Sequence, residues 1–301
     1  MNILRRFPAV IILMIACLGL GAGPVLAAPV PADPPTTHDL EVLKVQLDGL
    51  VAQGKAGGVQ FWYVDRATHT VQLTVLRSAA LDPVTVAFLA VAKVRPELVS
   101  IELVDNPTIP LIGYGLPAAS QQPRANTLYG GQKITAANGG YCTSGFNAQD
   151  PNGNPAALTA GHCTKAGRPN WTLSGATLGN ITDFNYPNAD WSAITPTSGW
   201  DLPSAVQTAK GIQPITAWST PRLNEPICKT GATSATTCGT VTALNVTINY
   251  GDGPVYGLAR TSVYAQEGDS GGSVYDSSTA VALISGGPKG GGPAFIQPLN
   301  F

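Results

Sequence analysis

The sequence predicts a protein built mainly from packed antiparallel β-sheets, with a small α+β module before them. Short apolar segments that end at Gly, Pro or Asp recur in the second half, at residues 240–250, 255–264, 281–285 and 294–299. No long helical period appears among them. Four of the five cysteines and 25 of the 34 glycines lie between residues 128 and 301. The chain therefore divides into two parts of different composition.

The first residues indicate the compartment of the protein. Arg5 and Arg6 precede an apolar run at residues 10–20, and small residues follow at 25–28. This order is typical of a secretory signal peptide, which we assign to residues 1–27. The apolar run is too short for a membrane anchor. We expect a secreted, extracellular protein with no membrane contact in its mature form; retention at the cell surface stays open as an alternative.

Composition and cysteine content limit the other properties. Only 12% of the residues are charged and the formal net charge is −1, which indicates a compact globule and excludes a polycationic nucleic-acid binder. We expect a monomer. The four cysteines after the signal invite two disulfides, with three connectivities open. Their wide spacing beside a single histidine does not resemble a zinc site, so no metal is predicted.

The first part, residues 28–127, contains elements of both kinds. Asp82 and Pro83 form a cap and first position for a helix that ends before Pro96. Residues 59–64 and 70–76 are predicted strands, the second with alternating Val71, Leu73 and Val75. The stretch 115–127 is rich in Pro, Ala, Ser and Gln and has no apolar period. We predict an exposed, cleavable linker there.

Three segments of the second part carry polar side chains of catalytic type. They are TAGHC at 159–163, NADW at 188–191 and GDSGG at 268–272. Each one alone is more often a structural His, a turn Asp or a Gly-rich loop. Together they are restrictive, because His162 is the only histidine after residue 69.

The chemistry explains why these three residue types belong together. A serine hydroxyl becomes a useful nucleophile when a base takes its proton, and the base needs a carboxylate behind it. Ser270, His162 and Asp190 would supply these roles. The order His, Asp, Ser argues against an α/β-hydrolase, in which the histidine follows the serine. The subtilisin order could be formed only with Asp150, in a domain that is short for that fold.

The same segments resemble the active-site motifs of chymotrypsin-fold bacterial serine proteases of the streptogrisin and α-lytic protease family. The likeness extends through residues 129–131, 228–253, 257–260 and 285–287, and so covers nearly all of residues 128–301. It implies two six-stranded antiparallel β-barrels with the active site between them. It implies disulfides Cys142–Cys163 and Cys228–Cys238, each stabilising by about 3 kcal/mol in the chain-entropy model. A third disulfide found in many relatives is absent, with Tyr264 at one of its positions.

The resemblance also assigns roles around the nucleophile. The backbone N–H groups of Gly268 and Ser270 would form the oxyanion hole. Asp269 should turn inward, and a buried carboxylate needs a partner. Lys229 stands where relatives carry an internal arginine. We therefore predict a structural ion pair between Asp269 and Lys229, against the alternative of a solvated surface lysine.

The specificity pocket is less well indicated. Ser285, Gly286 and Gly287 resemble the pocket wall that pairs with substrate backbone, and Tyr264, Ala265 and Gln266 should lie near the pocket. No carboxylate occupies the predicted pocket floor, which argues against cleavage after Arg or Lys. Ile284 stands where glutamate-specific relatives have a histidine. A neutral or apolar side chain is therefore the predicted preference.

The resemblance implies that the chain is the zymogen of a secreted serine endopeptidase. Such an enzyme acts on polypeptide substrates without a cofactor. Residues 28–127 resemble a pro-segment that assists folding and blocks the cleft, and residues 128–301 form the protease domain. We expect the pro-segment to be cleaved between Ala125 and Leu128. Two alternatives stay open: a catalytically silent member of the fold that binds a partner, and an esterase that uses the same triad.

Overall fold

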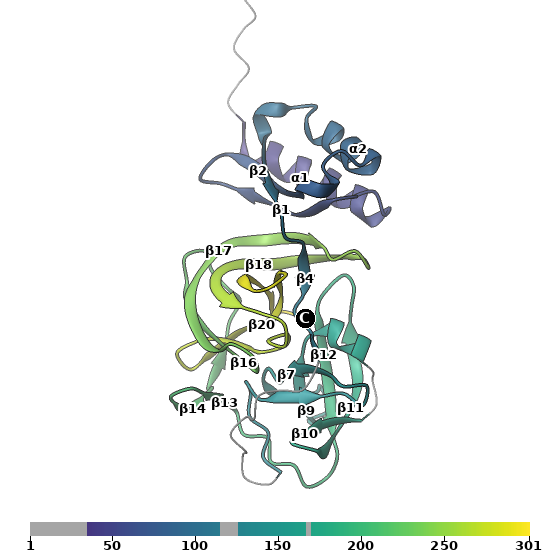
Figure 1. Cartoon of the computed structure of the whole chain (residues 1–301). Coiled ribbons are helices and arrows are strands. Elements are labelled where there is room, and N and C mark those ends of the chain that lie inside the picture. The colour runs from purple at the N-terminus through teal and green to yellow at the C-terminus, as the bar shows by residue number, and fades with distance from the viewer. Residues whose placement is uncertain (1–34, 115–125, 167–169) are drawn as a thin grey trace, which may run out of the picture. The chain divides into compact units, whose positions relative to one another are not determined.

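A computed structural model describes residues 35–114, 126–166 and 170–301 (Figure 1). The predicted signal peptide, residues 1–27, lies outside the described residues. Most of the predicted linker, residues 115–125, also lies outside them. In the described ranges, no helix is long and apolar enough to cross a membrane.

Residues 35–107 form the N-terminal module, with helices beside a three-stranded sheet (Figure 1). Strands β1 and β2 are antiparallel, and β3 returns parallel to β2 after helix α2. Asp82 caps α2 as predicted, because its side chain accepts from the N–H groups of Val84 and Thr85. The elements are α1 (Thr37–Ala52), β1 (Val59–Asp65), β2 (Thr70–Leu76), α2 (Pro83–Ala92), β3 (Val99–Val104) and short 3₁₀ turns at Arg77–Ala79 and Pro96–Leu98.

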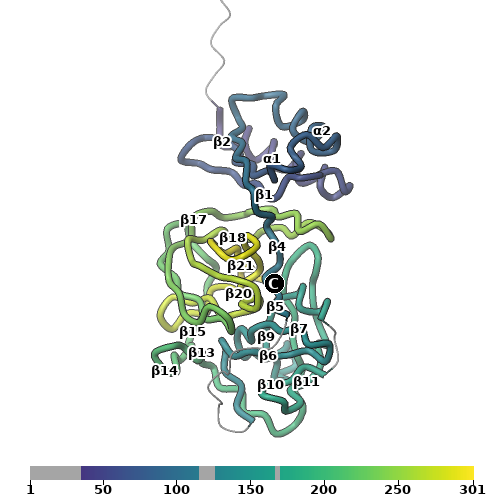
Figure 2. The backbone as a smooth tube through the Cα atoms, viewed as in Figure 1, coloured from purple at the N-terminus to yellow at the C-terminus, as the bar shows by residue number. Residues whose placement is uncertain are grey.

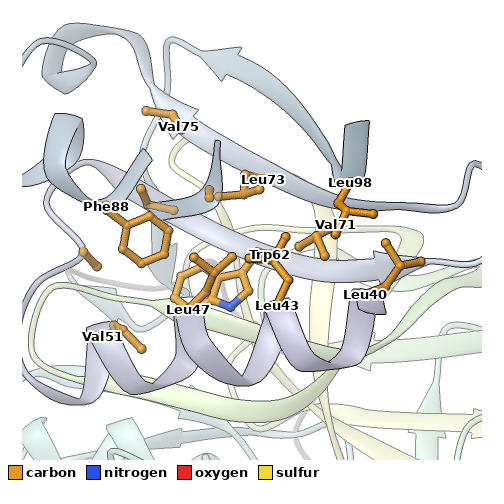
Figure 3. Packing of buried hydrophobic residues seen from close by; sticks show 13 residues of the cluster. Leu40, Leu43, Leu47, Val51, Trp62, Val71, Leu73, Val75, Phe88 and Leu98 are labelled. Carbon is orange, nitrogen blue, oxygen red and sulfur yellow. The ribbon is translucent and has the colours of Figure 1, made fainter. Parts of the chain in front are cut away.

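The core of the module is formed where helix α1 covers the sheet (Figure 3). Leu40, Leu43 and Leu47 recur at helical spacing on α1 and are buried. They pack around Trp62 of β1, which is fully buried and also contacts Phe88 of α2 at 5.4 Å between ring centroids. The module therefore has an apolar core of its own.

The first barrel closes through six strands, if β7 and β8 are taken as one bent strand. The order is β6, β7–β8, β9, β12, β11 and β10, and β10 returns to β6. Buried Trp171 and Ile194 belong to its core. The strands are β6 (Lys133–Thr135), β7 (Gly140–Thr143), β8 (Asn147–Gln149), β9 (Pro155–Thr159), β10 (Trp171–Leu173), β11 (Ala176–Asn185) and β12 (Trp191–Pro196).

The second barrel also closes through six strands. The order is β16, β17, β18, β21, β20 and β19, and β19 returns to β16. These strands are β16 (Pro226–Gly231), β17 (Ala235–Asn249), β18 (Pro254–Ala265), β19 (Ser273–Asp276), β20 (Thr279–Pro288) and β21 (Gly292–Pro298). Short strands β13 (Ala205–Thr208), β14 (Gly211–Pro214) and β15 (Ala217–Trp218) lie in the connection between the barrels. The two-barrel architecture predicted from the sequence is confirmed.

The N-terminal module contacts the second barrel along one strand edge, which we call the edge contact. Strand β1 pairs antiparallel with β17, with Trp62 opposite Thr247. Lys44 donates from Nζ to Asp48 Oδ2 at 2.8 Å and to Thr247 Oγ1 at 2.9 Å. Asp48 Oδ1 accepts from Trp62 Nε1 and from Thr247 Oγ1, both at 2.8 Å. A buried polar network therefore joins α1, β1 and β17.

The chain leaves the module as the cleft segment, residues 108–114, which contacts both barrels (Figure 2). Its strand β4 (Thr108–Pro110) pairs antiparallel with β20, and its strand β5 (Gly113–Tyr114) pairs antiparallel with β7. Further along, Leu128 donates its N–H to Asp201 O at 2.9 Å. The chain is therefore already packed against the first barrel at residue 128.

Candidate active site

The three predicted catalytic side chains meet, although they come from separate segments. His162 lies in the 3₁₀ turn Gly161–Ala166 after β9, Asp190 directly before β12, and Ser270 in the turn between β18 and β19. All three are fully buried in this chain. The closed barrels bring together residues that lie 28 and 108 positions apart.

Their hydrogen bonds form a continuous line. His162 Nε2 lies 2.6 Å from Ser270 Oγ. On the other side of the ring, Nδ1 lies 2.9 and 3.0 Å from the two carboxylate oxygens of Asp190. The backbone N–H of His162 also donates to Asp190 Oδ1, at 2.8 Å. The arrangement can move a proton from the serine hydroxyl to the imidazole while the carboxylate holds the ring.

Asp190 is held by further groups. Ser285 Oγ donates to its Oδ2 at 2.5 Å, and its own N–H donates to Gln297 Oε1 at 2.8 Å. Burial raises the pKa of Asp190. The charge of His162 and the hydrogen bonds from His162 and Ser285 lower the pKa by more than burial raises it, so it falls below its ordinary 3.8. The carboxylate therefore stays ionised at neutral pH.

Tyr250 and Gln297 are two supporting residues that the sequence analysis missed. The Tyr250 hydroxyl lies 2.9 Å from Ser285 Oγ, and Ser285 in turn donates to Asp190. Burial and then the nearby carboxylate raise the pKa of Tyr250 well above 10.0, so the phenol stays protonated. Neither residue lies in a recognisable motif, and only the closed barrel brings them to Asp190.

The predicted oxyanion donors point at one carbonyl of the cleft segment. Gly268 N–H donates to Leu111 O at 2.5 Å, and Ser270 N–H donates to the same oxygen at 3.4 Å. Gly268 has φ +100°, and a Cβ there would lie 2.2 Å from the ring of Tyr141. Only glycine fits this turn, which explains its place in the motif.

Four of the six predicted pocket residues lie beside the cleft segment, and the other two lie at more exposed positions. The Ser285 carbonyl accepts from Leu111 N–H at 3.3 Å, and Gly286 and Gly287 lie opposite Pro110 and Ile109. Ala265 is buried in the same apolar cluster as Leu111. By contrast, Tyr264 is 43% exposed and donates from its hydroxyl to Gln266 Oε1 at 3.1 Å.

Lys229 and Asp269 form a fully buried pair behind the nucleophile. Lys229 Nζ lies 3.0 Å from Asp269 Oδ2 and donates to Ala235 O at 2.9 Å and to the Ser234 hydroxyl. Asp269 Oδ1 accepts from the backbone N–H groups of Thr233 and Ser234. Burial lowers the pKa of Lys229, and the attraction of Asp269 opposes that shift. The pair fixes the residue that stands between Gly268 and Ser270.

The disulfides lie beside these segments. Cys142 is joined to Cys163, next to His162, and Cys228 is joined to Cys238, next to Lys229. In the part of the chain that the structure describes, Cys142, His162 and Cys163 form a cluster with metal-ligand spacing. Its two sulfurs are bonded to each other and carry no thiolate, so the cluster gives no argument for a metal site.

The chain is similar to known bacterial proteases. No family model matches it. Serine protease 2 of Streptomyces fradiae is 38% identical over 164 residues, which cover 53% of this chain and 94% of that protein. Serine protease 1 of the same species is 29% identical over 335 aligned positions, covering 96% of this chain and 93% of that protein.

The solved structures agree with this assignment. One is described as "A glutamic acid specific serine protease utilizes a novel histidine triad in substrate binding"; it has a TM-score of 0.53 at 36% identity, covering 57% of this chain and 94% of that chain. Both comparisons thus agree with the family resemblance noted in the sequence. The chain belongs to the family of bacterial chymotrypsin-fold serine proteases that contains the streptogrisins and α-lytic protease, and it is a serine endopeptidase.

Proposed function

We propose that Ser270, His162 and Asp190 hydrolyse peptide bonds through an acyl-enzyme intermediate, and that the chain is the secreted precursor of this protease. The observation that carries the proposal is the 2.6 Å contact between Ser270 Oγ and His162 Nε2, with Asp190 bonded to the opposite ring nitrogen. The serine also stands beside two N–H groups that converge on one carbonyl oxygen.

The reaction has two halves. Ser270 Oγ attacks the substrate carbonyl carbon while His162 takes the hydroxyl proton, and the N–H groups of Gly268 and Ser270 bind the oxyanion. The C–N bond then breaks, His162 gives its proton to the leaving amine, and the acyl-enzyme remains. Water attacks that ester with His162 again as base, which releases the carboxylic acid and restores Ser270. Asp190 stabilises the imidazolium throughout.

The proposed preference is a neutral or apolar side chain before the cleaved bond. The relative of known structure is described as glutamic-acid specific through a histidine triad. This chain has three histidines in all, at positions 38, 69 and 162, and His162 already contacts Ser270. Ile284, next to the pocket wall, is buried and apolar. The protease part therefore lacks the histidines that such a substrate site would need.

The N-terminal module is proposed to be a pro-segment that assists folding and inhibits the protease. Two features support this role: the strand β1 extends the sheet of the second barrel, and the cleft segment covers the triad. Serine protease 1 of Streptomyces fradiae aligns with nearly the whole chain, so the likeness is not confined to the protease part. The proposed domains are a signal at 1–27, the pro-segment and linker at 28–127, and the protease at 128–301.

The test is to express the full chain with Ser270 intact and as Ser270→Ala, and to treat both with a serine-directed phosphonate probe and with matched peptide and ester substrates. Ser198→Ala, which alters an exposed turn serine, is the control. We expect labelling and peptide hydrolysis in the wild type and the control only. The loss in Ser270→Ala should be on the order of 10⁶ in kcat.

Each other outcome contradicts a stated part of the proposal. Ester turnover without peptide turnover would indicate an esterase. A correctly folded and processed wild type that neither binds the probe nor cleaves would indicate a silent binding protein. Cleavage that persists in Ser270→Ala would exclude this serine as the nucleophile.

A further inference from the structure

The cleft segment lies in the site as an extended peptide and contacts both barrels. Before Leu111, Ile109 lies opposite Gly287 on β20. After it, Gly113 lies opposite Tyr141 on β7. A segment that only covered the site could run in any direction. This one follows two strand edges in register, as a bound substrate does when it adds a strand to a sheet.

One peptide bond is singled out by three hydrogen bonds. Leu111 N–H donates to Ser285 O at 3.3 Å, and Leu111 O accepts from Gly268 N–H at 2.5 Å and from Ser270 N–H at 3.4 Å. The carbonyl that lies between the oxyanion donors belongs to the bond between Leu111 and Ile112. That is the position in which Ser270 can attack.

Pro110 disfavours a slip of this register. If the segment shifted by one residue so that Pro110 took the place of Leu111, Pro110 would lie opposite Ser285 O. Proline has no backbone N–H and could not donate to that carbonyl. The slip would also move Leu111, which is fully buried, out of its place. Sequence and geometry therefore select the same bond.

The side chain of Leu111 shows what the pocket accepts. It belongs to an apolar cluster with Val263, Ala265 and Ile284. A Cβ added at Gly287 would lie 3.4 Å from Leu111 Cδ1, in van der Waals contact, so Gly287 lies beside the leucine side chain. An unpaired charge in this place would be costly to bury.

We infer that Leu111–Ile112 is the chain's own first cleavage site, and that the pocket prefers leucine-sized aliphatic residues before the cleaved bond. The inference rests on the proposed function. Ser270 Oγ bonds to the Leu111 carbonyl carbon, the C–N bond to Ile112 breaks, and His162 returns the proton to the Ile112 amine. Water then releases Leu111 as a carboxylate. Trimming between Ala125 and Leu128, the junction expected from the sequence, is a later step.

The experiment is a time course of the purified full chain at neutral pH, followed by intact mass and N-terminal sequencing. The first new N-terminus should be Ile112. The rate constant for its appearance should not change on tenfold dilution, because the reaction is intramolecular. Leu111→Asp should slow this cut by about a hundredfold or more, since a carboxylate must enter an apolar pocket. Leu111→Met should cut at nearly the wild-type rate, and Leu223→Asp, at an exposed leucine, should not differ from the wild type.

A second readout uses peptides that carry Ile-Pro-X before the cleaved bond, with X as Leu, Met, Lys or Glu. Leu and Met should exceed Lys and Glu in kcat/KM by about a hundredfold. A first N-terminus at residues 126–128 without Ile112, or a preference for Glu, would overturn the inference while labelling of Ser270 by the probe continues. No labelling and no cleavage anywhere would instead mean that the proposed function itself is wrong.

Discussion

The N-terminal module contacts the barrels in two ways that differ in chemistry. The edge contact depends on particular side chains, since Lys44, Asp48 and Trp62 form a polar network with Thr247. The cleft segment is held mainly by backbone hydrogen bonds to β20 and β7 that any extended peptide could make, and Leu111 is its one fully buried side chain. A protease must keep its cleft general in order to bind many substrates. Selective binding of its own module therefore has to come from the edge.

Each contact has a lysine–aspartate pair beside it, and the two pairs differ in burial, which makes the comparison testable. Lys229 and Asp269 lie behind the oxyanion donors and are both fully buried. Lys44 and Asp48 lie at the edge, where the Lys44 side chain is 4% exposed and Asp48 is 23% exposed. Removal of one partner leaves a buried charge without its counter-ion, and the cost rises with burial.

The largest effect is expected for Lys229→Ala in a Ser270→Ala background that keeps the chain whole. The free energy of unfolding should fall by about 3–5 kcal/mol, because Asp269 is left buried and unpaired. The same change in the active enzyme should lower kcat, since Asp269 connects the two oxyanion donors. Urea unfolding and steady-state kinetics measure the two effects, with Lys210→Ala as an exposed control. Unchanged stability and activity would refute the pairing.

A smaller effect is expected for Asp48→Ala in the same background. It leaves Lys44 buried with only Thr247 as a partner, and we expect a loss of about 3 kcal/mol in the stability of the module. Circular dichroism at helical wavelengths reports on this part, because both described α-helices belong to the module. Glu41 lies on the same helix as Asp48 and forms an exposed pair with Arg66, and Glu41→Ala should cost less than about 0.5 kcal/mol. Equal effects from the two variants would mean that the Lys44–Asp48 pair at the edge contact contributes no more stability than an exposed pair.

The smallest effect concerns Lys133, whose Nζ lies 3.4 Å from the centre of the Tyr141 ring beside the cleft segment. Burial lowers the pKa of Lys133 to about 8 from 10.5. The unfolded chain therefore binds more protons between pH 8 and 10.5, and stability should rise with pH across that window. Lys133→Met should flatten this rise by about 1 kcal/mol or less, because the residue as a whole is only partly buried and solvent screens its charge. Urea unfolding at pH 7.5 and 10 measures the difference, and an unchanged slope would contradict it.

Local signals in the sequence predicted local structure well. Asp82 and Pro83 marked the start of α2, and alternating Val71, Leu73 and Val75 marked β2. Helix α1 was missed, although Thr36 and Asp39 form a capping box at its start. Strand β3 was missed too, because its parallel pairing with β2 depends on the intervening helix.

The catalytic residues of the site could be predicted from the sequence. That the cleft segment lies in the site could not. Ser270, His162 and Asp190 stood in recognisable motifs. By contrast, Gln297 reaches Asp190, and Tyr250 reaches Ser285, only through barrel closure. Nothing in residues 108–114 indicates that they would pair with β20, more than 170 positions away. Such long-range pairing depends on the completed fold.

The connection between β3 and the cleft segment has a kinetic consequence. Only residues 105–107 separate the end of β3 from β4, and Thr108 N–H is held by Gln60 Oε1 of β1 at 2.9 Å. A cut after Leu111 thus leaves residues 108–111 of the cleft segment attached to the N-terminal module. Its effective concentration in the cleft stays in the millimolar range or above while the edge contact holds. Such a cut alone would produce a lag rather than a burst of activity, and the protease would begin work when its module is destroyed.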